Sequence, residues 1–401
     1  MRILNEMFIN SVNLKECLMC IMSFLFFFSL SVTGLKSIGI IIDTLIVLLL
    51  LIVYKQNIFD EIKSVDSRVQ KGFLFFLIAI ILSSICIFDI QSIRVALNYV
   101  IYSLQFMLAY LLVKDYRCSR YGIYGLLFGL LTVCVIDLYN YVVLNKQRLG
   151  VMFGHPNLDA SMIEMLLPIC ILYIVYLLYK KNNTYEIIFL GVLFLVGVVC
   201  LFLTKSRGAI LGSVLGLFLS SIFFVYKYKK MKSIIRVLVP IFLVCMIGVF
   251  GLYSVNNGKF NRSYDNERLL LIESSYNMWN DHKMFGVGLA NWKKEYGNGY
   301  ILPNAKEPNL SFPHNVYIYY FSTTGIVGGI GFLTFLYLIV KYLVCNLSFR
   351  GLNGAMTFAL LWVLIAISIH GLVDGGLVLK KCYKLFCGIL GMIVTLNSRF
   401  S

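Results

Sequence analysis

Polar residues that could do chemistry stand at the start of three long apolar runs in this chain. The stretch "RLGVMFGHPN" (148–157) precedes one run, "TKSRGA" (204–209) precedes another, and "PHN" (313–315) precedes a third. If each run is a helix, its first residues offer unpaired backbone N–H groups and a partial positive charge. An arginine beside such N–H groups favours phosphate oxygens, because both supply hydrogen-bond donors. These positions indicate an anion site.

Each of these motifs also has a purely structural interpretation. Pro156 and Pro313 are ordinary residues for the first turn of a helix. Glycines at four-residue spacing, Gly208, Gly212 and Gly216, are typical of a face where two membrane helices pack closely. Arg207 lies beside that face with no acidic residue nearby in the sequence, which favours a ligand for it.

The elements that must position these residues are membrane-spanning helices. The chain has 401 residues, 60% of them hydrophobic and 13% charged, whereas soluble domains have about 45–50% and about 25%. Apolar runs long enough to cross a bilayer recur along the whole chain, without the apolar–polar alternation of barrel strands. We therefore predict an all-α, polytopic integral membrane protein with a single membrane domain over residues 1–401.

Apolar runs between charged breaks predict twelve transmembrane helices. They cover residues 17–35, 38–54, 72–90, 93–113, 121–144, 157–179, 186–204, 208–226, 237–253, 313–340, 352–370 and 383–398. The first run is too long for a signal-peptide core and has no cleavage pattern, so we expect it to stay as a helix. The remaining long polar stretch, 254–311, is expected to be a loop between helices 9 and 10 that carries short helices.

The distribution of Lys and Arg orients these helices. Every second loop is rich in them, and these loops contain Lys55, Lys63, Arg68, Lys71, Lys114, Arg117, Arg120, Lys180, Lys181, Lys227, Lys229, Lys230, Lys232, Arg236, Lys341, Arg350 and Arg399. We predict a multi-pass protein of the cytoplasmic (inner) membrane with both termini in the cytoplasm. The loop 254–311 and the active site are then extracytoplasmic. Much of the net charge of +16 is a topology signal, so no nucleic-acid partner is expected.

A helix is predicted early in the long loop. Asp265 or Asn266 can cap it, and the spacing of Leu269, Ile272, Tyr276 and Trp279 is amphipathic. This helix is expected to lie over the outer face. Acidic and basic residues nearly balance in the loop, so anion recognition must come from individually placed residues.

All four histidines, His155, His282, His314 and His370, fall on the predicted outer side. The unperturbed pKa of histidine, about 6.5, suits a general base near neutral pH. A histidine that only bonds a loop carbonyl is the structural alternative. The "CxxC" of Cys17 and Cys20 has no second pair, so we expect small apolar side chains there and no metal site.

The ordered set "R…FGHPN", "TKSRGA", "NERLLLIESSYNMW" (266–279), "PHNVYIYYF" and "HGLVDGGL" (370–377) resembles the O-antigen ligase and repeat-unit polymerase family, over residues 145–378. The resemblance implies an inverting, metal-independent glycosyltransferase that works at the outer membrane face without a cofactor. The family's functional arginines match Arg207 and Arg268, and its functional histidine matches His314. These three are the expected catalytic residues.

The resemblance also implies a glycan donor on undecaprenyl diphosphate, a glycan acceptor and contact with membrane lipids. A flippase and a chain-length regulator are further candidate partners. The expected substrate-binding residues are Arg148, His155, Asn157, Asn315, His370 and Asp374.

Three functions remain open at this point. A polymerase would join repeat units that are both lipid-linked. A ligase would move finished glycan to lipid A–core or another acceptor; its form often has a leucine shortly after the histidine, where this chain has Val316 to Tyr319. A transporter of polysaccharide or small molecules would fit the helix number but not the clustering of polar residues at one face.

Overall fold

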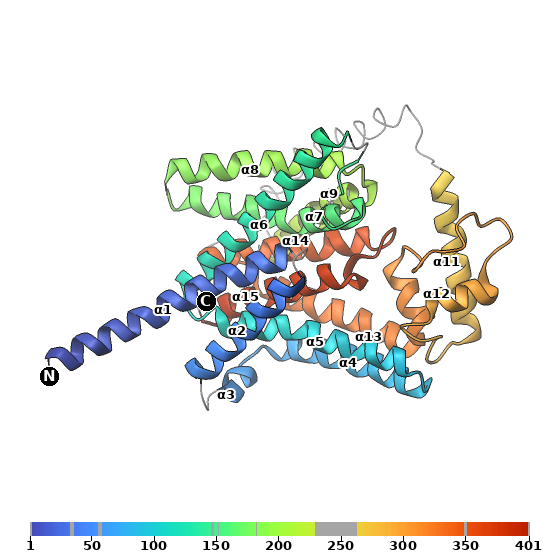
Figure 1. The fold of residues 1–401 in the computed structure, drawn as a ribbon, viewed down its shortest axis with the longest axis horizontal. Coiled ribbons are helices and arrows are strands. Elements are labelled where there is room, and N and C mark those ends of the chain that lie inside the picture. Colours follow the sequence, from blue (N-terminus) through green and yellow to red (C-terminus); the bar gives the residue numbers. More distant parts are fainter. Residues whose placement is uncertain are drawn as a thin grey trace.

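The computed structural model describes residues 2–32, 36–54, 58–145, 148–150, 152–181, 183–228, 263–348 and 351–399, and within these ranges it contains helices but no strand (Figure 1). The helices are α1 (Arg2–Ser31), α2 (Lys36–Tyr54), α3 (Ile58–Lys63), α4 (Ser67–Cys86), α5 (Ile90–Leu112), α6 (Tyr116–Val143), α7 (Pro156–Tyr179), α8 (Thr184–Leu203), α9 (Arg207–Tyr228), α11 (Ser263–Asp281), α12 (Trp292–Glu295), α13 (Val316–Asn346), α14 (Gly351–His370) and α15 (Lys380–Arg399).

The prediction of an all-α polytopic membrane protein is confirmed. Nine of the described helices are long and apolar enough to cross a membrane, and α2 contains a shorter apolar stretch, Gly39–Leu51. Helix α15 corresponds to the last predicted span but falls outside that group. Its side chains are buried along most of its length, so it needs less apolar surface than a lipid-facing helix. The predicted ninth span, 237–253, and the loop residues 254–262 lie outside the described residues, so the full count of twelve stays a prediction.

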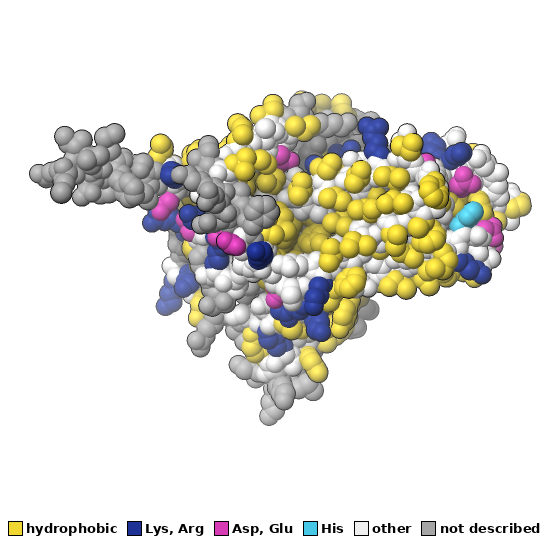
Figure 2. Space-filling view, turned by 90° about the horizontal axis from the view of Figure 1, so that it is seen from below, with side chains coloured by type: hydrophobic (Ala, Val, Ile, Leu, Met, Phe, Trp, Pro, Cys, Tyr) yellow, Lys and Arg dark blue, Asp and Glu magenta, His cyan; other side chains and the backbone are white. Residues whose placement is uncertain are grey.

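The surface of the bundle shows where lipid would lie. Figure 2 shows a broad field of apolar side chains in the middle of one face, with charged side chains toward both ends. On α4, for example, Leu74, Phe75 and Ile78 are more than half exposed. Large apolar side chains exposed in a continuous field are unusual for soluble proteins and indicate contact with a membrane.

Side-chain caps set where several helices begin. Asp66, Asp89 and Asp115 accept hydrogen bonds from backbone N–H groups in the first turns of α4, α5 and α6. His155 does the same for α7 through Nδ1, and Asn315 for α13 through Oδ1. The last two helices therefore begin at residues that the sequence singled out for function.

A break in α13 anchors the turn that follows α11. Gly325 has φ 65°, which interrupts the helix. The freed carbonyls of Ser322 and Thr323 accept from the N–H groups of Val287 and Gly288 at 2.9 and 2.8 Å. In return, the N–H of Ile326 donates to the Lys283 carbonyl at 2.8 Å. This exchange leaves few unpaired backbone groups and fixes α11 and α12 at one end of the bundle (Figure 1).

Helix α11 exists as predicted, but its buried face and its start are not the predicted ones. Leu271 and Met278 are buried, whereas Leu269 is 65% and Tyr276 50% exposed. The helix begins at Ser263, so Asp265 lies in its first turn rather than at its cap. The buried side is partly polar because it packs on a polar loop, which removes the apolar contrast that the prediction used.

We predict that Gly325→Ala destabilises the fold. A Cβ at this position would lie 2.2 Å from the Met284 carbonyl oxygen, and the positive φ disfavours any L side chain. The apparent melting temperature of the purified protein should fall. Gly297→Ala is the matched control, because a Cβ there meets nothing within 4 Å. Equal melting temperatures for the two variants would contradict the role of the helix break.

The predicted orientation can be tested with exposed positions at the two ends of the bundle. Asn304 lies in the loop after α12, and Thr184 begins α8 at the far end of α7. In a background without the exposed Cys17 and Cys345, Asn304→Cys should react with an impermeant thiol reagent on intact cells. Thr184→Cys should react only after permeabilisation. The reverse pattern would invert the topology.

Candidate active site

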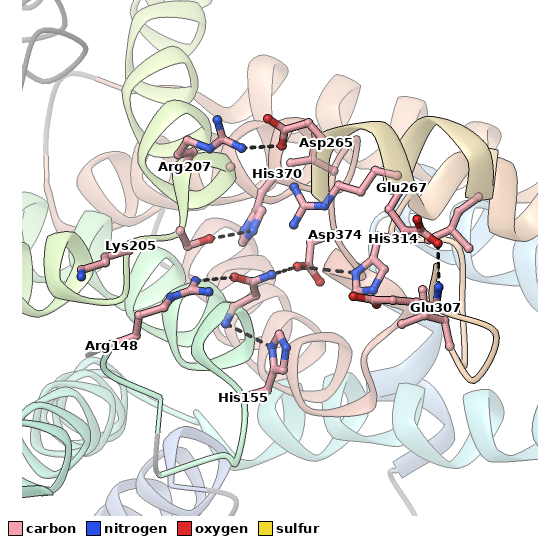
Figure 3. Close-up of a pocket in the computed structure, with 17 residues that line it drawn as sticks. Arg148, His155, Lys205, Arg207, Asp265, Glu267, Glu307, His314, His370 and Asp374 are labelled. Atoms are coloured by element: carbon pink, nitrogen blue, oxygen red, sulfur yellow. Dashed lines mark hydrogen bonds and ion pairs between the residues drawn. The ribbon is translucent and has the colours of Figure 1, made fainter. Parts of the chain in front are cut away.

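A cavity of about 350 Å³ lies between the ends of α7, α9 and α14 and the segment of α11 that covers them (Figure 3). Its lining comes from five separate parts of the chain. The residues are Arg148, His155, Asn157, Lys205, Ser206, Arg207, Gly208, Asp265, Glu267, Arg268, Leu271, Glu307, Leu310, His314, His370, Val373 and Asp374. Four bases and four acids line it besides the histidines, so binding of an anion must depend on which charges are already neutralised.

The basic residues of the cavity differ in their partners. Arg207 contacts Asp265 of α11 at 2.5 Å, an acid 58 positions away in the sequence. Both side chains of this pair are partly exposed, and such pairs contribute only about 0–1 kcal/mol, so an anionic ligand can replace Asp265 at small cost. The side chains of Arg268 and Lys205 form no ion pair or hydrogen bond with another residue in the part of the chain that the structure describes. Their charge is available to a ligand.

Most of the cavity's carboxylates are already engaged by the protein. Glu267 accepts from the backbone N–H groups of Lys306 and Glu307 at 3.0–3.1 Å, which holds the loop before α13 against α11. Asp374 accepts from the Asn157 amide and from the Gly375 N–H. With Asp265 on Arg207, three of the four carboxylates have hydrogen-bond donors within the protein, and among described residues Glu307 is the exception. These bonds hold the three carboxylates in place around the cavity.

One line of polar contacts crosses the floor of the cavity (Figure 3). Arg148 donates to the Thr204 carbonyl at 2.8 Å and to Asn157 Oδ1 at 3.3 Å. Asn157 donates in turn to Asp374 Oδ2, which lies 4.0 Å from His314 Nδ1. This line fixes the position of an arginine on one side of the cavity relative to a histidine on the other.

His314 is held in an unusual conformation at the cavity. Its φ of 52° lies in the left-handed region, which histidine adopts more readily than most residues but still rarely. Its ring packs on Phe312 at 4.4 Å, and its Nδ1 atom is buried without a hydrogen bond to a described residue. Burial lowers the pKa of His314, with a smaller lowering by Arg268 and His155 and an opposing effect of Asp374. The ring is therefore neutral and able to accept a proton near neutral pH.

The glycine face of α9 packs as its spacing indicates. A Cβ at Gly208 would lie 2.6 Å from Val373 and 2.7 Å from His370, and one at Gly216 would lie 2.8 Å from Ala366. The face thus brings α9 against α14. His370, at the end of α14, reaches the cavity because of this close approach.

The structure brings most of the predicted site residues together. Arg148, His155, Asn157, Arg207, Arg268, His314, His370 and Asp374 all line the cavity. Asn315 does not; its side chain caps α13 and donates to the Leu372 carbonyl at 2.9 Å. His282 is exposed and lies outside the lining. The functions of all these residues stay predictions.

Sequence reasoning missed several lining residues. Ser206 and Lys205 lie in "TKSRGA", where only Arg207 and the glycine face carry a sequence signal. Asp265 was predicted only as a helix cap, and Glu267 and Glu307 lie in a loop whose charges nearly balance. Among described residues, a group able to hold a metal ion is found elsewhere, at Cys20, Asp115 and Cys118, where α1 meets α6.

Comparison with known proteins adds one match. The model of the O-antigen ligase family matches residues 190–333, from α8 into α13, a region that contains Arg207, Arg268 and His314 but not Arg148 or Asp374. No curated protein matches the chain. The match supports an O-antigen ligase or polymerase type of function, with a lipid-linked glycan as substrate in a membrane setting. The resemblance predicted from the sequence is thus confirmed: over these residues the chain is similar to O-antigen ligases.

Proposed function

We propose that this protein polymerises oligosaccharide repeat units linked to undecaprenyl diphosphate, at the outer face of the cytoplasmic membrane. The observation that carries the proposal is the cavity itself. It combines arginines suited to a diphosphate with a neutral histidine suited to a base, at one end of a membrane bundle. A lipid carrier has its diphosphate at the membrane surface, where such a cavity can bind it while the lipid tail stays in the bilayer.

The arginines stabilise the leaving group. When the acceptor oxygen bonds to the anomeric carbon, the bond from that carbon to the diphosphate oxygen breaks, and undecaprenyl diphosphate leaves with the electron pair. Arg207 and Arg268 approach from α9 and α11, so their guanidinium groups can hold the diphosphate from two sides. Fixed cationic donors stabilise developing charge without reorganisation.

His314 takes the proton of the acceptor hydroxyl. Asp374 lies 4.0 Å from Nδ1, where it stabilises the imidazolium that forms, and Nε2 is then the nitrogen that accepts the proton. Attack from the face opposite to the diphosphate inverts the configuration at the anomeric carbon. The positive φ of His314 and the Phe312 contact hold the ring at this place.

We propose the polymerase rather than the ligase, and the residues after the histidine leave the acceptor class open. The ligase form often has a leucine a few residues on, and this chain has Val316, Tyr317, Ile318 and Tyr319. The test is reconstitution of the purified protein with undecaprenyl-diphosphate-linked repeat unit as sole glycan substrate. Longer lipid-linked products and released undecaprenyl diphosphate are expected. Product formation only after addition of a different acceptor would make the protein a ligase.

We predict that Arg207→Lys and Arg268→Lys each impair transfer strongly. Lysine keeps the charge but loses the planar fork of donors, and hydrogen bonds to charged groups contribute about 1.5–3 kcal/mol, so a loss of roughly 10- to 100-fold in kcat/KM is expected. Arg94→Lys, at an exposed arginine on α5 outside the cavity, is the control. If the Arg207→Lys and Arg268→Lys variants each make polymer of wild-type length at normal protein level, the two arginines have no part in the mechanism.

We predict that His314→Ala loses most transfer and keeps donor binding. A general base typically raises the rate of such a reaction by about 10²–10⁴-fold. Because the pKa of His314 is lowered, the acid limb of the wild-type rate profile should lie below the ordinary range of histidine. His282→Ala, outside the cavity, should behave as wild type. If His314→Ala abolishes binding of the lipid-linked donor, the histidine belongs to the diphosphate site instead.

A further inference from the structure

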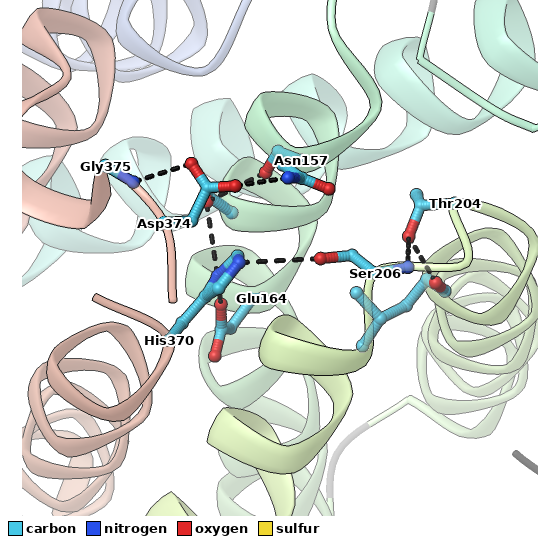
Figure 4. A network of polar contacts seen from close by, with 9 residues as sticks. Asn157, Glu164, Thr204, Ser206, His370, Asp374 and Gly375 are labelled. Carbon is cyan, nitrogen blue, oxygen red and sulfur yellow. Dashed lines mark hydrogen bonds and ion pairs between the residues drawn. The ribbon is translucent and has the colours of Figure 1, made fainter. Parts of the chain in front are cut away.

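A buried chain of hydrogen bonds leads from the interior of the bundle to the cavity (Figure 4). Glu164 Oε2 lies 2.8 Å from His370 Nδ1, and His370 Nε2 lies 3.4 Å from Ser206 Oγ. Glu164 and His370 are at most 1% exposed, and Ser206 is 4% exposed. We call these three residues the relay. Only its last two members line the cavity.

Helices α7 and α9 leave space for the Glu164 carboxylate inside the bundle. Glu164 lies inside α7, and an ionisable group within a membrane span is costly unless it serves a purpose. A Cβ at Gly212 of α9 would lie 2.5 Å from Glu164 Oε1, so the glycine face leaves room for this carboxylate as well as for α14. Replacing the buried pair by apolar residues would fill the same space more cheaply. The cost points to a role at the cavity end of the relay.

The backbone of Ser206 is already engaged, and its hydroxyl is not needed to start α9. The Ser206 N–H donates to Thr204 Oγ1 at 3.2 Å, and its carbonyl accepts from the Ile210 N–H at 3.2 Å. The hydroxyl faces His370 at the cavity, one residue before Arg207. A hydroxyl that accepts one hydrogen bond can still donate its own proton.

We propose that Ser206 is a direct ligand of the donor's diphosphate and that Glu164, acting through His370, is a positioning residue for it. The Glu164 carboxylate holds an imidazolium at Nδ1, Nε2–H donates to Ser206 Oγ, and the Ser206 hydroxyl donates to a phosphate oxygen. From the imidazolium outward, the Nε2–H and the Ser206 hydroxyl both point toward the anion, whereas Nδ1–H donates back to Glu164, and hydrogen bonds in such a chain strengthen one another. The inference rests on the proposed function, because it assumes that a polyprenyl diphosphate enters this cavity.

The test is a binding measurement that needs no transfer. The full-length protein in detergent is titrated with farnesyl diphosphate, a soluble polyprenyl diphosphate, and the Kd is measured. Ser206→Ala should weaken binding about 10-fold, the loss expected for one hydrogen bond to a charged group. Ser206→Thr, which keeps the hydroxyl, should restore most of the affinity. Ser221→Ala is the control, because the Ser221 hydroxyl of α9 donates to the Leu217 carbonyl of its own helix and does not line the cavity. An unchanged Kd for Ser206→Ala overturns the proposal.

The role of Glu164 is tested by a double-mutant cycle. Glu164→Gln keeps the size of the side chain but removes the charge that holds the imidazolium, so it should also weaken binding. In the Ser206→Ala background it should have no further effect, because its effect passes through the serine. If instead the two losses add, Glu164 acts on the fold in general and the relay is wrong. His370→Gln serves in the same cycle should Glu164→Gln not fold.

Failure of the proposed function gives a different result. If the wild-type protein does not bind farnesyl diphosphate at all, the cavity is no diphosphate site, and both the function and the relay are wrong. If the wild-type protein and Ser206→Ala bind farnesyl diphosphate equally well, the relay is wrong but the proposed function is not contradicted.

Discussion

The close contact between α9 and α14 sets the dimensions of the cavity. Gly208, Gly212 and Gly216 allow the two helices to approach until a single added Cβ would collide with the neighbour. This approach places Arg207, at the first turn of α9, across from His370 at the last turn of α14. Without it the arginine motif and the "HGLVDGGL" segment would be separated by side chains, and no common cavity would form.

Acidic and basic side chains nearly balance in the lining of the cavity. Asp265, Glu267 and Asp374 each have partners within the protein, so they shape the site more than they repel an anion. Arg268 and Lys205 have no such partner among the described residues. A bulk positive field would attract any polyanion, whereas this arrangement places unpaired donors at particular positions around one site.

Much of the fold follows from composition, because an apolar run of sufficient length has few alternatives to a membrane helix. The glycine face and the polar lining residues near helix starts were also predictable, since polar groups there stand out against an apolar chain. The buried face of α11 was not. Glu267 accepts from backbone N–H groups of the loop before α13, and Ser275 accepts from Trp292 Nε1 of α12. Hydrophobic spacing carries no signal for such contacts. The pairing of Arg207 with Asp265 was equally hidden, because it joins segments far apart in the sequence.

The central claim is that the diphosphate of a lipid carrier binds among these helix ends. A structure of the protein in a lipid nanodisc with undecaprenyl diphosphate tests it most directly. The account predicts density for the diphosphate in the cavity, in contact with Arg207 and Arg268 and close to His314, with the lipid tail leaving toward the bilayer. A headgroup bound elsewhere on the protein, with the cavity filled only by water, would contradict it.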